Sequence, residues 1–149
     1  MPDIDLTEKS ASPFASWKGQ HAGIRVSDFD DAVSWYVEKL DFRLTSYKVH
    51  GSTTLGFLSR SVDDSFVLEV LANPEGAERP AYEGLGSSHN IKGWHHICFR
   101  SDDVTAALEE LRRRGVSIVS EPIDVQAFGF RFAFFADPWG NLFELMQDL

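Results

Sequence analysis

Two stretches of the chain decide its fold: HAGIRVSDFDDAVSWYVEKL at residues 21–40 and HICFRSDDVTAALEELRRRG at residues 96–115. Each opens with a histidine and a short apolar strand and then passes a cluster of Ser and Asp. Apolar residues at i, i+3, i+4 and i+7 follow, which is the spacing of one helix face. Self-similarity of this kind marks an internal repeat. The chain is therefore predicted to contain two copies of one structural unit.

The segments that follow both helices are predicted to be strands. They are 42–49, 53–60 and 65–72 in the first half, and 116–120, 130–136 and 141–147 in the second. Every second residue from Phe128 to Phe134 is phenylalanine, which predicts one buried strand face. Each half then has the order βαβββ. The sequence predicts an α+β fold of two tandem βαβββ modules with mixed sheets.

Caps are predicted for both helices. Ser27, with Asp30 three positions on, resembles a capping box. Ser101 or Asp102 is expected to cap the second helix, and Gly115 is expected to end it.

Two polar stretches lie outside the repeated units. Residues 1–18 are predicted to form an N-terminal polar arm. Residues 73–92 are rich in Gly, Pro and Ser, and are predicted to be a linker and a candidate lid. The first module then spans residues 19–72 and the second spans residues 93–149.

Charge and composition exclude several classes of protein. The net charge of −9, without a basic stripe, argues against nucleic-acid binding, because phosphate contacts need a basic face. The single cysteine, Cys98, excludes an intrachain disulfide and argues against a thiolate zinc site. No apolar run approaches a membrane span of roughly 20 residues, and the first residues lack a signal pattern. A cytoplasmic protein without nucleic-acid or membrane partners is predicted.

The register of the repeat singles out four residues that can bind a metal. His21 and His96 are 75 positions apart, as are Glu69 and Glu144, and each histidine precedes its glutamate by 48 residues. The same offset relates Arg25 to Arg100 and Asp28 to Asp103. A carboxylate inside an apolar strand is expensive to bury alone. Because two neutral imidazoles and two carboxylates carry two negative charges, one divalent ion held by this set neutralises them.

Each ligand has an ordinary explanation on its own. A lone strand histidine is most often a core residue and a lone strand glutamate usually faces solvent, but four in matched register favour the metal site. His95 competes with His96, but the register selects His96, and strand alternation is expected to turn His95 to the opposite face. His50 and His89 have no counterparts and are expected at the surface. Cys98 is expected to line the pocket or, with better reason, to pack as a small core residue.

Four segments carry a resemblance to a known superfamily. They are HAGIRVSDFDDAVSWYVEKLDF (21–42), SFVLEVLAN (65–73), GWHHICFRSDD (93–103) and DPWGNLFELMQ (137–147). The chain resembles the vicinal oxygen chelate superfamily, which includes glyoxalase I, bleomycin resistance proteins, methylmalonyl-CoA epimerase and extradiol dioxygenases. The resemblance implies that each module is a half-barrel, with the metal in the cleft between modules. It also implies a homodimer, since many members of the fold pair.

The His-Glu-His-Glu set resembles the pattern of bacterial glyoxalase I, which implies roles for further residues. Arg25 stands where that family has an arginine contacting glutathione, Asn73 completes an E-x-x-x-N spacing, and Lys92 stands where some members bind a glutathione carboxylate. Arg25 also has a simpler reading as the partner of an acidic neighbour, and Asn73 as a turn residue. Trp139 departs from the family pattern, in which an acidic residue is common at its place.

The resemblance implies a small-molecule substrate and a metal-dependent lyase or isomerase. A glyoxalase I would convert a 2-oxoaldehyde–glutathione hemithioacetal to S-2-hydroxyacylglutathione through a metal-bound enediolate, with Glu144 as principal base and Glu69 as its counterpart. Mixed nitrogen and oxygen ligands suit Zn, Ni, Co, Mn or Fe. Three alternatives stay open: a methylmalonyl-CoA epimerase-like isomerase, an extradiol-type dioxygenase and a non-catalytic drug-binding resistance protein.

Overall fold

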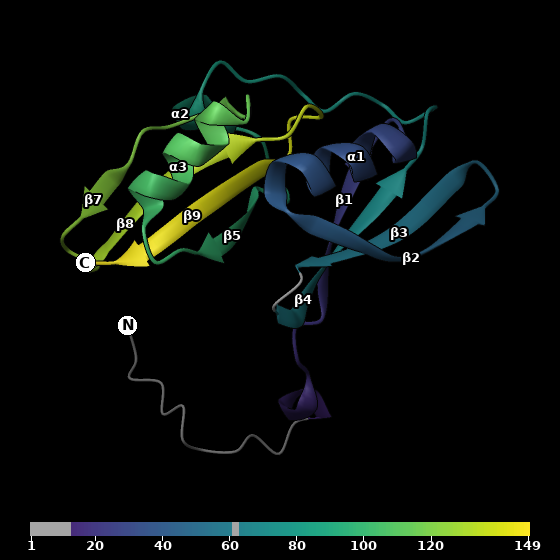
Figure 1. Ribbon diagram of the computed structural model, residues 1–149, viewed down its shortest axis with the longest axis horizontal. Helices are drawn as coiled ribbons and strands as arrows, with labels where there is room; N and C mark the ends of the chain where they lie inside the picture. The colour runs from purple at the N-terminus through teal and green to yellow at the C-terminus, as the bar shows by residue number, and fades with distance from the viewer. Residues whose placement is uncertain (1–12, 61–62) are drawn as a thin grey trace.

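The first module is a four-stranded sheet covered by one helix (Figure 1). The computed structural model describes residues 13–60 and 63–149. The elements of the module are β1 (His21–Val26), α1 (Phe29–Leu40), β2 (Phe42–His50), β3 (Thr53–Arg60) and β4 (Asp63–Ala72). The sheet order is β1-β4-β3-β2, with β1 parallel to β4 and the other pairs antiparallel. The βαβββ order is confirmed.

The second module repeats this arrangement beside the first (Figure 1). Its elements are β5 (His96–Arg100), α3 (Val104–Arg113), β6 (Ser117–Ile118), β7 (Ile123–Val125), β8 (Phe130–Ala136) and β9 (Leu142–Asp148). The order is β5-β9-β8-β6, with β5 parallel to β9, and β7 also pairs with β8. The α+β fold of two tandem βαβββ modules is therefore confirmed.

The strand predicted at residues 116–120 is reduced to β6, and a further short strand, β7, follows it. Between them lies Pro122, which has no backbone N–H to donate to a ladder. The backbone N–H groups of Val119 and Ser120 both donate to the carbonyl of Phe134, at 2.8 and 3.0 Å. A regular ladder therefore cannot continue through this segment.

The N-caps of both helices differ from the prediction, which named Ser27 and either Ser101 or Asp102, whereas Gly115 follows α3 with a φ of 77°, as expected. Asp28 caps α1 by accepting from the backbone N–H of Asp31 at 2.9 Å, and Asp103 caps α3 by accepting from that of Ala106 at 2.9 Å. Ser27 and Ser101 do not serve as the N-caps, because the backbone turns into each helix at the aspartate. Asp28 and Asp103 are the pair that the repeat offset relates, and their carboxylates favour the positive helix ends.

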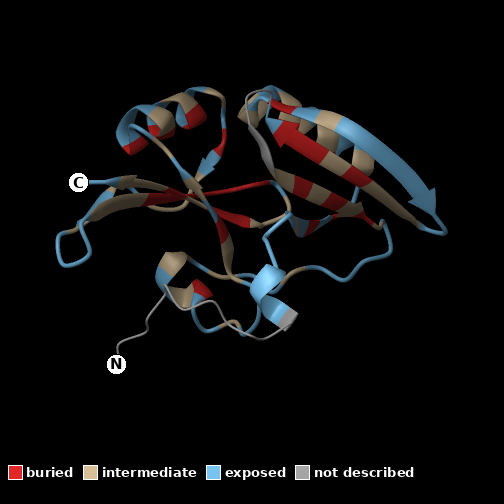
Figure 2. Cartoon of the chain, turned by 90° about the horizontal axis from the view of Figure 1, so that it is seen from below, coloured by how far each residue is buried: buried red, intermediate tan, exposed pale blue. Residues whose placement is uncertain are grey.

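The two modules share one hydrophobic core. Tyr36 of α1 is fully buried, and its ring centroid lies 6.2 Å from that of Phe143 in β9. Phe42 faces Phe99 with the ring centroids 6.3 Å apart. The Tyr36 hydroxyl donates to the buried Oδ2 of Asp137 at 2.6 Å. Figure 2 shows the buried residues gathered where the helices lie on the sheets.

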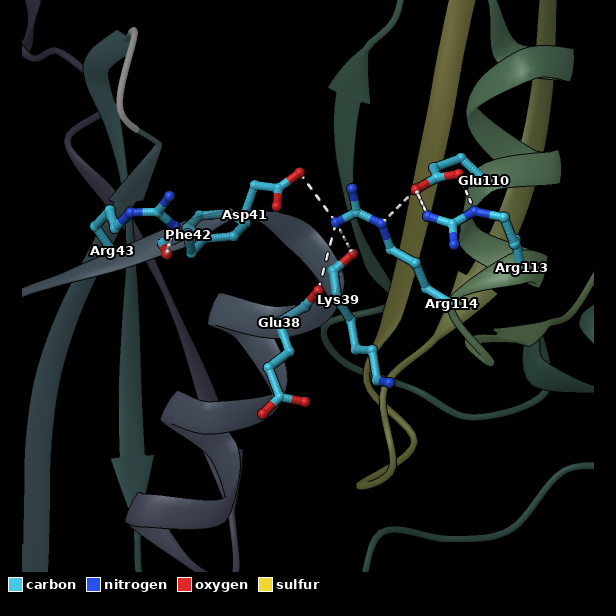
Figure 3. A network of polar contacts seen from close by, with 8 residues as sticks. All are labelled: Glu38, Lys39, Asp41, Phe42, Arg43, Glu110, Arg113 and Arg114. Atoms are coloured by element: carbon cyan, nitrogen blue, oxygen red, sulfur yellow. Dashed lines mark hydrogen bonds and ion pairs between the residues drawn. The ribbon is translucent and has the colours of Figure 1, made fainter.

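Arg114, just after α3, ties the helices of the two modules together (Figure 3). Its Nη1 lies 3.0 Å from Asp41 Oδ2 and donates to the Lys39 carbonyl at 3.1 Å, while its Nε donates to Glu110 Oε1 at 2.7 Å. A cation at the C-terminal end of α1 complements the negative end of that helix. The relative placement of the modules is therefore fixed by polar contacts as well as by the core.

Residues 73–92 carry a short helix, α2 (Leu85–Ser88), which lies against the second module. Tyr82 and Leu85 pack on the cluster of Phe134, Ala136 and Leu142. None of the helices within the described residues is long and apolar enough to cross a membrane.

Candidate metal centre

The first His–Glu pair is built by the parallel strands β1 and β4. His21 pairs with Val67 and Gly23 with Glu69 in the register of these strands. His21 Nε2 lies 3.4 Å from Glu69 Oε2. A side chain at Gly23 would meet this carboxylate, because a Cβ there would lie 3.3 Å from Glu69 Oε2. The glycine therefore leaves the space that the carboxylate occupies.

The second pair repeats this geometry on β5 and β9. Cys98 pairs with Glu144 in the register, as Gly23 does with Glu69. His96 Nε2 lies 3.1 Å from Glu144 Oε2. The matched positions of the duplicated sequence thus give matched positions in space.

All four side chains are turned away from the helices. In β1, the buried residues Ile24 and Val26 face the core, so that His21 lies on the other side of the sheet. The glutamate side chains are mostly buried, with 18% of Glu69 and 15% of Glu144 exposed, whereas the histidines are 40% and 32% exposed. Each pair therefore presents an accessible imidazole beside a sheltered carboxylate.

The spacing within each pair fits two donors of one ion. Nitrogen and oxygen donors lie about 2.0–2.2 Å from a zinc-like ion, so neighbouring donors in one coordination sphere lie roughly 3 Å apart. The separations of 3.4 and 3.1 Å agree with this value. A mixed nitrogen and carboxylate set also suits several divalent metals. Each His–Glu pair therefore fits two ligands of a divalent ion.

A single chain does not bring the two halves together. Within residues 13–60 and 63–149, no group of three or more His, Cys, Asp and Glu side chains is placed to hold an ion. His21 lies with Glu69 in one module, and His96 lies with Glu144 in the other. These four residues, which were predicted to surround one point, thus form two separate pairs.

The three residues expected to contact substrate differ in their surroundings. Arg25 is exposed on the sheet face of His21, and its backbone carbonyl accepts from Asn141 Nδ2 at 3.1 Å. Asn73 Oδ1 accepts from the backbone N–H of Glu75 at 3.0 Å, which is a local turn contact. Lys92 is exposed in the segment before β5.

His95 does not lie on the face that strand alternation predicted. Because β5 begins at His96, the preceding residue stands outside the pleat. His95 Nδ1 lies 2.7 Å from His96 Nδ1, and its Nε2 lies 2.8 Å from Ser88 Oγ. Burial first, and then the neighbouring His96, lowers the pKa of His95, which favours the neutral ring. Ser88 was not among the predicted site residues, although the sequence has a Gly-Ser-Ser run close to two histidines.

Cys98 lies on the same face as His96 and is exposed, so the expectation that it packs in the core is wrong. Burial of its sulfur, and then a hydrogen bond with Glu144, raises the pKa of the Cys98 thiol to about 12. The thiol is therefore protonated at neutral pH and is not a thiolate ligand. His50 and His89 are exposed, as expected.

The phenylalanines of the predicted buried face instead form a wall that becomes more exposed away from the second pair. The ring centroids are 5.1 Å apart between His96 and Phe134, 5.8 Å between Phe134 and Phe132, and 6.1 and 6.0 Å in the next two steps, to Phe130 and Phe128. Phe134 is buried, whereas Phe128, which precedes β8, is 76% exposed. The second pair thus adjoins an apolar surface.

A comparison with models of protein families identifies the superfamily of the chain. The model of the Glyoxalase/Bleomycin resistance protein/Dioxygenase superfamily matches residues 18–145. The chain belongs to this superfamily. The match covers both modules and confirms the resemblance predicted from the sequence.

Individual relatives are 27–29% identical to the chain over the aligned residues. The uncharacterized protein YwkD of Bacillus subtilis is 29% identical over 119 residues, which cover 79% of this chain and 87% of YwkD. A probable lactoylglutathione lyase of Synechocystis is 28% identical, covering 85% and 92%. Glyoxalase I of Zea mays superposes with a TM-score of 0.67 at 27% identity, over 86% of this chain and 43% of that one. The chain thus spans less than half of the maize enzyme, as it does of an Arabidopsis lactoylglutathione lyase.

Proposed function

We propose that the chain is a divalent-metal-dependent lyase of the glyoxalase I type. Its reaction would convert the hemithioacetal of glutathione and a 2-oxoaldehyde to S-2-hydroxyacylglutathione. The observation that carries the proposal is the duplicated His–Glu pair, with separations of 3.4 and 3.1 Å at equivalent strand positions. Relatives at 28% and 27% identity that are lactoylglutathione lyases or glyoxalase I support the choice of reaction.

His21, Glu69, His96 and Glu144 would hold the ion, which is Zn, Ni, Co, Mn or Fe. When bound, the ion supplies a Lewis acid that stabilises the negative charge developing on the substrate oxygens. Glu144 Oε2 takes the proton from the carbon beside the carbonyl, and Glu69 acts from the opposite side of the substrate. The proton leaves one carbon and is returned to its neighbour, so atoms and electrons balance without a further reactant.

A second copy of the chain would complete the site. Each chain offers two half-sets in separate modules, and no larger ligand group occurs within its described residues. In a two-fold dimer, the first pair of one chain can meet the second pair of its partner, which gives two equal sites. Because the chain covers 43% of the maize glyoxalase I, two copies approach the length of that enzyme.

Charge favours a glutathione adduct as the substrate. Arg25 is exposed on the face of the first pair, and Lys92 is exposed four residues before His96. These cations would bind the carboxylates of glutathione, with Asn73 as a third polar contact. The phenylalanine wall beside His96 would receive the apolar part of the oxoaldehyde.

Complementation tests the cross-chain site. One variant carries His21→Ala and Glu69→Gln, the other His96→Ala and Glu144→Gln, and both are assayed with methylglyoxal and glutathione after metal analysis. Each alone is expected to be inactive. In a purified heterodimer, one site combines the two altered pairs and the other combines the two unaltered pairs. About half of the wild-type activity should therefore return.

The outcomes separate the alternatives. An inactive heterodimer would contradict a cross-chain site. Turnover of methylmalonyl-CoA by the wild type, in place of the hemithioacetal, would favour the epimerase alternative. A wild-type protein that bound none of the five metals would point to a binding protein rather than an enzyme.

A further inference from the structure

A chain of polar contacts runs from the linker to the second His–Glu pair. Ser88 is 2% exposed, and its hydroxyl donates to the Leu85 carbonyl at 2.6 Å. Ser88 Oγ also lies 2.8 Å from His95 Nε2, and His95 Nδ1 lies 2.7 Å from His96 Nδ1. On the far side of that ring, His96 Nε2 lies 3.1 Å from Glu144 Oε2.

The protons of Ser88 and of neutral imidazole rings set the direction of the contacts from the Leu85 carbonyl to His96 Nδ1. The Leu85 carbonyl can only accept, so the single hydroxyl proton of Ser88 goes to it, and Ser88 Oγ must accept from His95 Nε2–H. A neutral imidazole has one N–H, which leaves His95 Nδ1 with a lone pair. Because one proton must lie between the two Nδ1 atoms, it belongs to His96. His96 Nε2 therefore has no proton.

This tautomer is the one a metal site needs. A metal-binding histidine donates a lone pair from one ring nitrogen, while the other nitrogen donates its proton to a fixed acceptor. Here the bare Nε2 faces the carboxylate of Glu144, and both atoms are donors of electron pairs. His95 thus takes the place of the carboxylate or carbonyl that accepts the N–H proton of the non-ligating ring nitrogen in many metal-binding histidines.

The first module has an equivalent contact, in which the residue before the histidine also meets its Nδ1 atom. His21 Nδ1 hydrogen-bonds to Gln20 Oε1, and an amide oxygen can only accept. His21 is therefore protonated on Nδ1 and presents a bare Nε2 to Glu69. Gln20 and His95 are 75 positions apart, the offset that relates the ligands themselves. The residue before each ligand is thus an acceptor for its Nδ1 proton.

We propose that Gln20 and His95 are positioning residues that hold His21 and His96 with the Nε2 lone pairs directed to the ion, and that Ser88 holds His95 in turn. The proposal rests on the proposed metal-dependent function, since the ion is what uses these lone pairs. It also gives residues 73–92 a role in the site. Ser88 of α2, held by the Leu85 carbonyl, would orient His95 and through it His96.

The tautomers can be read directly in the metal-free protein. Long-range proton–nitrogen NMR of the imidazoles, at alkaline pH where the rings are neutral, is expected to show His21 and His96 protonated on Nδ1. The free side chain mainly has the other tautomer, so the result is diagnostic. A spectrum in which His96 is protonated on Nε2 would overturn the proposal, whether or not the protein binds a metal.

Two substitutions at His95 separate positioning from packing. His95→Phe keeps a ring against Phe134 but removes the acceptor, and it should weaken metal affinity by about 10- to 100-fold. It should also move the His96 proton to Nε2. His95→Asn puts an amide oxygen near the place of Nδ1, and both affinity and tautomer should stay near those of the wild type.

His89→Phe is the matched control. The His89 ring lies 5.0 Å from the His95 ring but is outside the chain of polar contacts, so metal affinity should not change. Affinity is measured by competition with a chromophoric chelator. Wild-type affinity and an unchanged tautomer in His95→Phe would contradict the positioning role while leaving the metal site standing. A wild type that bound no ion would instead contradict the proposed function, and the NMR result would still decide the tautomer.

Discussion

At the scale of single residues, Glu144 carries the largest share of the proposed chemistry. Its side chain is 15% exposed, lies 3.1 Å from His96 Nε2 and adjoins the apolar phenylalanine wall through Phe134. A base in such a sheltered place acts on the substrate without competition from bulk water. Glu69 occupies the equivalent place in the first module, where it pairs with Phe57 of β3, whose ring centroid lies 5.8 Å from that of His21.

Replacing Glu144 by Gln tests the base assignment. The amide oxygen can still bind a metal but cannot take a proton, so we expect kcat to fall by about 10²-fold or more. Metal content is measured in parallel, so that loss of the ion is not mistaken for loss of the base. Glu69→Gln is the comparison, with a smaller loss expected. Rates near those of the wild type with the ion retained would refute the role of Glu144.

Several of the site residues could be found from the sequence alone, because a duplicated fold repeats its functional positions. The 75-residue offset selected His21, His96, Glu69 and Glu144, and the structure pairs them as the offset requires. The contact of His95 with His96 was missed, because alternation was applied to a residue that precedes its strand. The offset already related it to Gln20, and this was the signal that could have found both.

At the scale of elements, the periodicities predicted strands and helices well and their ends less well. The strands at 53–60 and 130–136 have the predicted bounds. The predicted N-caps were wrong, because a run such as SDFD or SDD offers several side chains that can accept from a helix N-terminus, whereas Gly115 ends α3 as predicted. Which one is the cap depends on where the backbone leaves the strand, and this is set by the pairing of β1 with β4 and of β5 with β9.

Asp103→Ala tests the observed cap of α3. The substitution removes the acceptor for the backbone N–H of Ala106, so the free energy of unfolding should fall by about 1 kcal/mol. Ser101→Ala and Asp102→Ala are the controls and should change it by less than about 0.5 kcal/mol. Urea unfolding of the four proteins measures these differences. A larger loss in Ser101→Ala than in Asp103→Ala would restore the cap expected from the sequence.

At the scale of the whole molecule, the repeat shows which residues are equivalent but not how far apart they lie. The distance between the two His–Glu pairs depends on how the modules dock, and that depends on contacts without a sequence signature. The hydroxyl of Tyr36 reaches Asp137, and Trp139 Nε1 donates to Ser27 Oγ at 2.9 Å. Tyr36 appeared in the sequence only as one apolar position of a helix. A common point for four ligands within one chain was therefore not predictable from the repeat.

The contact between Tyr36 and Asp137 should govern how stability depends on pH. Burial raises the pKa of Asp137 above its ordinary value, whereas hydrogen bonds from Asn141 and Tyr36 lower it. Burial also raises the pKa of Tyr36, so its hydroxyl stays a donor. Because the folded protein holds the Asp137 proton more tightly than the unfolded chain, the free energy of unfolding falls as pH rises from the unfolded pKa through the folded one.

Tyr36→Phe removes one donor from this buried carboxylate, and the free energy of unfolding near neutral pH should fall by about 1–3 kcal/mol. The loss should be smaller in acid, where Asp137 is protonated and the missing bond is no longer to a charge. Urea unfolding at several pH values measures both effects. Tyr47→Phe, at an exposed tyrosine, is the matched control and should change stability by less than about 0.5 kcal/mol. A deficit in Tyr36→Phe that is the same at every pH would show that the hydroxyl contributes through packing and not through Asp137.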